Sequence, residues 1–557
     1  MDAPARRHAH SEATRLLCAG SHLDNGFRRR VIDELVGHEE RPAAPSLGID
    51  AVSVLAHALR ARRREVFTAL LLLALWICFF GVDIAMTDKE FNIPTPNVFE
   101  SSSGADAGFS GGDEPSSDAL SVPGGMALFY GAACFFLWAA RAVSALRPAT
   151  DTDQRRRGTK LPTFWGAVLI VPAWGAMLTY WMAALAGFTE KPASVIFPLL
   201  MALVIGVQRT RVATVMREEL GDEVFPHRRP PELPARRRYR RVGAAIAREQ
   251  YASMVLYDPH RPFVGAGSPY EPWSLALELK KPVAAVPNQG EVPLTSRTVI
   301  DLIKPRLIAL RASAERTSRD RLRQLEIEEF VYLPSGVPRD AGIYEPSAVA
   351  QHLAASVNEG GEARRHFLRI RVGAWDEQIV LSVLVRVHTQ GGMLVLEVVP
   401  HVLGPVTEEF RELDTLAARR PGDVPRESVQ AVLAAPAATF ATGIAAVGML
   451  VSAFRAAING PERALPDAPL TSVRELGSTN DLSLFQEMDV SRHIKTVQDR
   501  IASGVRDALE QSGYETDRFE QQIVNVREGG IFIGEMRGGA VATGAQGRAT
   551  HMQGDQQ

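Results

Sequence analysis

The chain has 557 residues, of which 46% are apolar, and a formal net charge of −2 at pH 7. This length exceeds that of one domain, and the near-neutral charge favours neither nucleic acid nor an acidic partner. The three cysteines, Cys18, Cys78 and Cys134, allow neither a disulfide framework nor a Cys/His zinc spacing. We therefore predict no nucleic-acid partner, no metal site and no cofactor.

Residues 1–64 are predicted to form a cytoplasmic, helical N-terminal segment, which four apolar stretches follow between residues 65 and 208. The first stretch runs VFTALLLLALWICFFGVDIA from Val66, and the others cover residues 122–146, 162–187 and 193–208. About twenty apolar residues in a helix cross a hydrocarbon layer of roughly 30 Å, and in lipid only a helix satisfies the backbone of such a run. We expect an α-helical membrane bundle of four spans. Its first span begins too far into the chain for a cleaved signal peptide.

Basic residues are concentrated in alternate loops between these stretches. Residues 147–160 hold five Arg or Lys and residues 209–241 hold ten arginines, whereas residues 87–121 hold one lysine and seven acids. Because basic loops stay on the cytoplasmic side, we predict a multi-pass protein of the cell membrane with a cytoplasmic N-terminus and main soluble domain. The loop at 87–121 is expected to be external and disordered, since it has few apolar side chains.

Two charged residues, Asp83 and Arg141, lie within the apolar runs. Charges inside a membrane can form an ion or proton relay, which gives a transporter or channel component as an alternative function. Each residue also lies near the end of its span, where a charged side chain can reach the interface. The second interpretation is the one that we favour.

A basic, proline-rich juxtamembrane linker covers residues 209–241 and ends with HRRPPELPARRRYRR. A polybasic segment beside the bilayer is attracted to anionic lipid by about 1 kcal/mol per basic residue. We predict lipid contact for the last arginines of this linker, which are Arg236, Arg237, Arg238, Arg240 and Arg241. The alternative is that these arginines only fix the orientation of the spans.

Residues 242–415 have the pattern of a cytoplasmic α+β domain. Helices are predicted at 242–250 and 298–314, and strands at 253–257, 274–279, 326–333, 366–375, 378–389 and 393–403. Gln390, Gly391 and Gly392 are expected to close a hairpin between the last two strands, because glycine adopts positive φ without a steric penalty. This order of elements predicts an antiparallel meander.

Two patterns in this domain are candidates for chemistry. The stretch PFVGAGSPY at residues 262–270 is glycine-rich, but no helix follows it promptly and no Walker lysine is present, so a structural turn is predicted. His366, His388 and His401 fall on three consecutive predicted strands, where a metal site would depend on an unknown register. We predict no catalytic, cofactor-binding or metal-binding residue. A membrane-tethered enzyme, using residues 262–270, is a further alternative function.

Two helical segments are predicted after the domain. Residues 428–458 form an apolar, alanine-rich segment that is expected to lie on or dip into the cytoplasmic face of the membrane, or else to be a fifth span. Residues 470–525 are predicted to form an amphipathic helical region suited to packing or self-association. Its apolar stripe is Ile494, Val497, Ile501, Val505 and Leu509.

Residues 529–557 form a glycine-rich tail with two short β-prone runs, IFI and AVAT. Such runs are too short to fold alone but suit in-register stacking of identical chains. We predict that the tail is disordered in the monomer and self-associates through Ile531, Ile533 and Val541. The alternative is a flexible tail without a function.

Five stretches carry a resemblance: YASMVLYDPHRPFVGAG, RHFLRIRVGAW, SVRELG, FQEMDVSRHIKTVQDRI and GGIFIGEMRGGAVATG. Together they resemble a group of actinobacterial multi-pass membrane proteins of uncharacterised function, over roughly the second half of the chain. This resemblance implies architecture only.

The tail is also similar to bacterial amyloid signalling motifs, which implies templating between a sensor and an effector. We therefore expect a membrane-anchored signalling or scaffold protein rather than an enzyme. Its expected partners are the lipid bilayer and, through the tail, a protein or a second copy.

Overall fold

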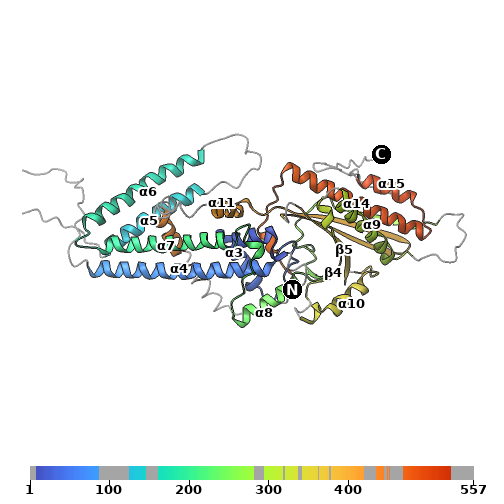
Figure 1. Ribbon diagram of the computed structural model, residues 1–557, viewed down its shortest axis with the longest axis horizontal. Helices are drawn as coiled ribbons and strands as arrows, with labels where there is room; N and C mark the ends of the chain where they lie inside the picture. Colours follow the sequence, from blue (N-terminus) through green and yellow to red (C-terminus); the bar gives the residue numbers. More distant parts are fainter. Residues whose placement is uncertain are drawn as a thin grey trace, which may run out of the picture. The chain divides into compact units, whose positions relative to one another are not determined.

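The structure is a computed structural model that describes most of the chain (Figure 1). The described residues are 8–86, 124–145, 161–281, 294–317, 320–336, 341–361, 363–374, 378–418, 434–444, 448, 451 and 468–527. The chain divides into two compact units. The sheet unit contains residues 1–60, 219–415 and 463–557, and the span unit contains residues 61–218 and 416–462.

Long apolar helices make up most of the span unit. They are α4 (Ala51–Ala85, which begins in the sheet unit), α5 (Gly125–Ala145), α6 (Leu161–Ala186) and α7 (Ala193–Glu218). Among the described residues, α4, α7 and the Gly125–Ala142 part of α5 are long and apolar enough to cross a membrane. A shorter apolar helix, Ile170–Ala186, belongs to α6. These three candidate spans are consistent with the predicted multi-pass membrane protein, whereas the remaining predicted span, at residues 162–187, corresponds to the shorter apolar helix in α6.

A carboxylate and several aromatic rings connect the helices of the span unit. The rings of Tyr130 on α5 and Tyr180 on α6 lie 5.0 Å apart, and the Tyr180 hydroxyl donates to the carbonyl oxygen of Ser194 at 2.5 Å. Asp83 is buried near the end of α4 and accepts a hydrogen bond from the backbone amide of Ala127 at 3.0 Å. The first amides of a helix have no partner within it, so Asp83 stabilises the start of α5.

Residues 434–444 are helical and pack against α5 within the span unit. The ring of Phe440 lies 5.3 Å from that of Phe135 and 5.5 Å from that of Trp138. The Nη1 of Arg141 lies 3.5 Å from the carbonyl oxygen of Ala434. The start of this helix is therefore beside the later part of α5, and its middle is beside the middle of α5. The two helices run antiparallel.

The described residues of the sheet unit form a curled, half-barrel sheet of seven strands in the order β1-β4-β5-β6-β7-β2, with β3 also paired to β7. The strands are β1 (Met254–Tyr257), β2 (Ser268–Pro269), β3 (Trp273–Glu278), β4 (Glu326–Pro334), β5 (Arg365–Ala374), β6 (Ile379–Gln390) and β7 (Met393–Leu403). The predicted α+β domain is confirmed, and β4 to β7 are the predicted antiparallel meander.

The sheet is mixed rather than purely antiparallel, because β1 pairs with β4 in parallel. Between these strands the chain passes through β2, β3 and the helix α9 (Ser296–Thr317). Parallel neighbours need a long crossover of this kind. The predicted meander did not include this pair, because periodicity within a strand does not give the direction of its neighbour.

The turn between β6 and β7 has the geometry that its sequence predicts. Gln390 pairs with Met393 across the two-residue turn of Gly391 and Gly392. These glycines have φ values of +59° and +77°. Positive φ at both central positions fits the right-handed twist of the flanking strands.

Helices cover one face of the sheet and bury its main core. The covering helices are α9, α14 (Leu484–Gln511) and α15 (Asp517–Arg527), and α14 lies beside α9 (Figure 1). The five residues of the predicted apolar stripe on α14 are all buried in this core together with Ile303 and Leu368. Gly504 allows the close approach, since a Cβ there would lie 2.6 Å from the Cα of Ile303. The stripe therefore packs within the chain.

Shorter helices complete the sheet unit. On the N-terminal side of α4 lie α2 (Glu12–Leu23), α3 (Asn25–Ile32) and a π-helical turn at Asp33–Gly37. Later in the chain are α8 (Arg237–Glu249), α10 (Pro346–Ser356), α11 (Glu412–Ala418) and α13 (Val473–Leu476). Single 3-10 turns lie at Phe225–His227, Arg321–Gln324, Ala341–Tyr344 and Glu408–Arg411.

Segments on both sides of the span helices meet inside the sheet unit. The buried Arg15 of α2 donates to the carbonyl oxygen of Leu220 at 3.1 Å and to Asp414 at 2.9 Å. Gln250 donates to Asp50 at 2.9 Å, also in the buried interior. Residues that precede α4, follow α7 and follow the sheet therefore share one folded core.

Candidate functional site

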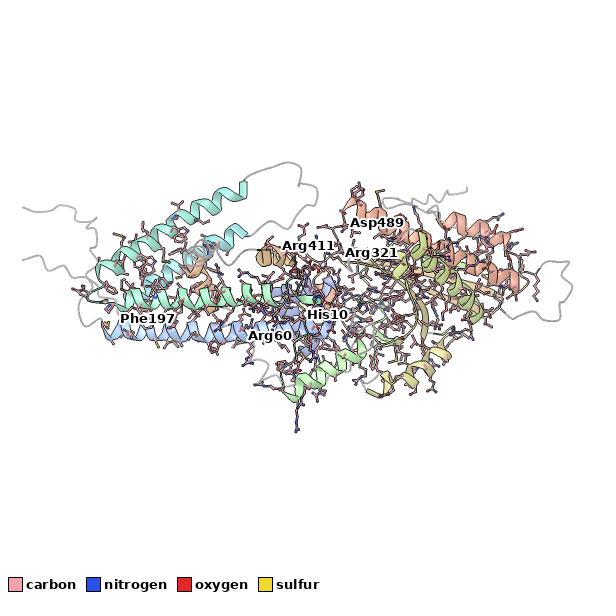
Figure 2. The ribbon with its side chains drawn as sticks, in the orientation of Figure 1. His10, Arg60, Phe197, Arg321, Arg411 and Asp489 are labelled. Carbon is pink, nitrogen blue, oxygen red and sulfur yellow. The ribbon has the colours of Figure 1, made fainter. Side chains whose placement is uncertain are left out.

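A hollow of about 120 Å³ lies in the sheet unit where α4 begins its run toward the apolar stretch. Its lining combines the N-terminal segment, the first turns of α4 and the chain after α7. The lining residues are Ala9, His10, Ser53, His57, Arg60, Glu219, Phe225, Arg228, Arg229, Pro230 and Pro231. Figure 2 labels two of them, His10 and Arg60. We call this site the basic hollow.

Three of the polar side chains that line the basic hollow come from one helix. Ser53, His57 and Arg60 are spaced by four and three residues on α4, so they share one face of that helix. In the loop after α7, Pro230 and Pro231 restrict the backbone after the turn at Phe225–His227, because each proline fixes its φ. The hollow is thus lined by one rigid helix, one stiff loop and the N-terminal segment.

Cations outnumber anions in the basic hollow. Three arginines line it, and Glu219 is the one acid among its lining residues. The formal charge of the lining is +2, counted as three arginines against one glutamate, and Arg60 donates to Glu219 with Nη1 and Oε2 2.5 Å apart. Arg228 and Arg229 are exposed at the rim. The hollow is therefore suited to an anion.

Two histidines add hydrogen-bonding groups to this lining. The Nδ1 of His57 lies 3.2 Å from the Nε2 of the buried His22, and the Nδ1 of His10 lies 3.4 Å from the carbonyl oxygen of Phe225. A hydrogen bond between two imidazole rings needs one donor and one acceptor nitrogen, so the tautomer of one ring fixes that of the other. The contact holds the ring of His57 against α2.

The arginines predicted to contact lipid lie at and just before the start of α8, outside the basic hollow. All five are exposed. Arg238 and Arg241 form ion pairs with Glu39, and Arg238 also donates to the carbonyl oxygen of Val36 at 2.8 Å. Burial raises the pKa of Glu39, but the hydrogen bonds from both arginines outweigh it and place the pKa below its ordinary value. These two arginines therefore also hold α8 against the N-terminal segment.

The glycine-rich stretch at 262–270 is a turn whose amides are bonded to a carboxylate of the same chain. Gly265 and Gly267 have φ values of +94° and +90°, and both amides donate to Oε1 of Glu475, at 2.8 and 3.2 Å. The other oxygen of Glu475 accepts from the amide of Ser472 at 3.0 Å. Adjacent backbone amides of this kind form an anion-binding concavity, and here its anion is Glu475.

The three histidines considered for a metal do not converge. His366 bonds Glu329 at 2.9 Å on the face that α9 covers, whereas His401 contacts the ring of Phe263 on the opposite face. His401 pairs with Ser382, which is six residues from His388 along β6, or about 20 Å. Among the described residues, no group of three His, Cys, Asp or Glu side chains could hold a metal ion.

The residues of the basic hollow were not predicted from the sequence. They are spread from Ala9 to Pro231, so no short motif contains them. One signal was present: Ser53, His57 and Arg60 form a polar helical stripe just before an apolar run. Ile531, Ile533 and Val541, the predicted self-association residues, lie outside the described residues.

Comparison with known proteins gives one finding, and it concerns the second half of the chain. No curated protein and no solved structure is significantly similar to this chain. The AbeC-like domain family matches residues 272–540, from just before β3 to beyond α15. The match includes both the meander and the helices that cover it. The chain thus carries an AbeC-like domain at residues 272–540.

Proposed function

We propose that the protein is a membrane-anchored signalling or scaffold protein, not an enzyme, which holds its sheet unit at the cytoplasmic face of the cell membrane. One observation carries this proposal. Residues on both sides of the apolar helices, before Arg60 and after Glu219, belong to one folded unit. The sheet unit is therefore tied to the bilayer at two points of the chain and cannot diffuse away from it.

The same observation supports four spans. A folded unit lies on one side of a membrane, so the chain between Arg60 and Glu219 crosses an even number of times. Three helices meet the length and apolarity of a span, and α6 contributes Ile170–Ala186 in addition. Four crossings satisfy this parity and place a span on every long apolar helix. The basic residues at 209–241 favour the cytoplasm for the sheet unit.

The same requirement for an even number of membrane crossings applies to residues 428–458. The strands before this segment and α14 after it share one core, so both of its ends lie on the same side of the membrane. A single fifth span would separate them. The helix at 434–444 runs antiparallel to α5 for eleven residues, about 16 Å, which is half of a hydrocarbon layer. We infer that the segment enters the membrane and returns to the face from which it came.

The two alternatives have less support. In a transporter, Asp83 and Arg141 would lie along the path of the transported ion or proton. Instead, Asp83 accepts a hydrogen bond from a backbone amide in the first turn of α5, and Arg141 lies at the start of the 434–444 helix. These contacts suit structural roles. In an enzyme, the turn at 262–270 would hold a phosphate, but Glu475 already occupies its amides.

Cysteine labelling tests the topology. In a variant whose three native cysteines are serine, single cysteines are placed at Ser110, Ser335 and Glu510. We expect an impermeant maleimide to label position 110 in intact cells, and positions 335 and 510 only after permeabilisation. Labelling of position 335 from outside would reverse the orientation. Opposite behaviour at 335 and 510 would make residues 428–458 a fifth span.

A pull-down from native membranes tests the scaffold role. The full chain is compared with a chain that ends at Glu528, which lacks the predicted self-association tail. We expect a protein partner or a second copy to be recovered only with the full chain. Equal recovery would show that the tail is not the binding segment, and an absence of any partner with both chains would count against a scaffold.

A further inference from the structure

We propose that the basic hollow binds the phosphate of an anionic lipid headgroup. Its lining has a formal charge of +2, since three arginines from α4 and from the loop after α7 stand against Glu219. Arginine donates up to five hydrogen bonds in a fixed planar arrangement that matches a phosphate. The imidazoles of His10 and His57 add further polar groups to the same wall.

One lining residue of the hollow lies close to the apolar stretch along α4. Arg60 precedes Val66, the first residue of that stretch, by six residues, or about 9 Å of helix. The headgroup region on each side of a bilayer is roughly 5–8 Å thick. Arg60 is therefore near the headgroup region along this helix.

The surroundings of the hollow also favour a lipid over a soluble anion. Arg62, Arg63 and Arg64 follow on α4 and continue the positive charge toward the apolar stretch. Basic pockets beside spans on the cytoplasmic side bind anionic headgroups in this way. Arg228 and Arg229 are exposed lining residues, so they are accessible to a headgroup.

The test uses the full chain in nanodiscs of neutral phosphatidylcholine, with phosphatidylglycerol as the titrated probe and native mass spectrometry to count bound lipids. The site variant is R228Q/R229Q. The matched control is R316Q/R323Q, which removes the same charge from exposed arginines of the sheet unit outside residues 209–241. We expect one retained phosphatidylglycerol per chain, about thirtyfold weaker binding in the site variant, and a change within about twofold in the control.

Three results would overturn the proposal. Equal weakening in both variants would mean a diffuse basic surface, and wild-type binding in the site variant would remove the hollow. Full competition by millimolar inorganic phosphate would make the site one for a soluble anion. The inference rests on the proposed membrane anchoring, which labelling at position 335 reports independently. If the wild-type chain retains no phosphatidylglycerol while labelling at position 335 follows the expected topology, the result counts against the hollow alone.

Discussion

Glu329 on β4 connects a strand to the helix that covers it. Its carboxylate accepts from both terminal nitrogens of Arg297 at 2.9 Å and from His366 at 2.9 Å, and it also pairs with Lys304. Burial raises its pKa, but the hydrogen bonds from His366, Arg297 and Lys304 outweigh it and place the pKa well below its ordinary value. Neither periodicity nor motif predicted this network, because its members come from α9, β4 and β5.

The Glu329 network should make the fold sensitive to acid. The pKa of Glu329 is lower in the folded chain than in the unfolded chain. Its contribution is therefore complete above about pH 4.5 and is lost as the pH falls toward the folded value. We expect Glu329→Gln to destabilise the sheet by about 2 kcal/mol at pH 7, after allowance for the partial exposure of Arg297 and Lys304.

Hydrogen exchange of β4 and β5 amides in the full chain measures this loss, as about thirtyfold faster exchange in the variant. The wild-type chain should lose protection below pH 4.5, while the variant changes less over that range. Glu315→Gln on α9 is the control, since this residue is exposed and carries the same charge. Unchanged protection in Glu329→Gln would mean that the network does not stabilise the fold.

Glu475 is the second residue whose role depends on distant parts of the chain. It connects α13 to the turn at Gly265 and Gly267 through two amide hydrogen bonds. Glu475→Ala removes the acceptor for both amides, and we expect a cost of about 2 kcal/mol and faster amide exchange at 264–268. Glu475→Gln keeps an acceptor oxygen and should cost about half as much. If both variants exchange as the wild type does, the turn is held by other contacts.

At the scale of elements, the approach of α14 to α9 depends on Gly504. A Cβ at this position would contact the backbone of Ile303, so side chains push the two helices apart. We expect Gly504→Val to destabilise the sheet unit by about 2 kcal/mol and Gly504→Ala by less, because overpacking cannot be relieved by a rotamer change. Lys495→Val, at an exposed position of the same helix, is the control. Thermal unfolding of the full chain in detergent should rank the three variants in this order, and a Gly504→Val chain as stable as the control would contradict the packing.

The elements that could be predicted from the sequence are those determined by residues close together in the chain. The φ values at Gly391 and Gly392 follow from the two-glycine turn, and the stripe from Ile494 to Leu509 follows from helical periodicity. The direction of β1 relative to β4 could not be predicted, since it depends on where α9 carries the chain. The basic hollow could not be predicted for the same reason, as its wall is assembled from segments more than 200 residues apart.

At the scale of the whole molecule, the inferred return of residues 428–458 to one face predicts where Ile444 lies. This residue is exposed in the span unit, at the end of the 434–444 helix. We expect a nitroxide attached at position 444 of the full chain in bilayers to be relaxed more by oxygen, which partitions into lipid, than by a water-soluble nickel complex. A nitroxide at Glu510 should show the reverse. Relaxation by the nickel complex at 444 would place the segment on the membrane surface.

The core of the sheet unit cannot be completed until late in synthesis, because α14 follows the strands that it covers. The face of the sheet that contains Leu368 is covered by α14, and Gln511 leaves the ribosome 108 positions after Leu403, the end of β7. At roughly 5–20 residues per second this takes roughly 5–20 s. During that interval the spans can already be inserted, while the part of this apolar sheet face that α14 covers is still exposed and only α9 covers the rest. A nascent chain that stops before α14 should therefore be recognised by chaperones or proteases as unfinished, although every membrane helix is in place.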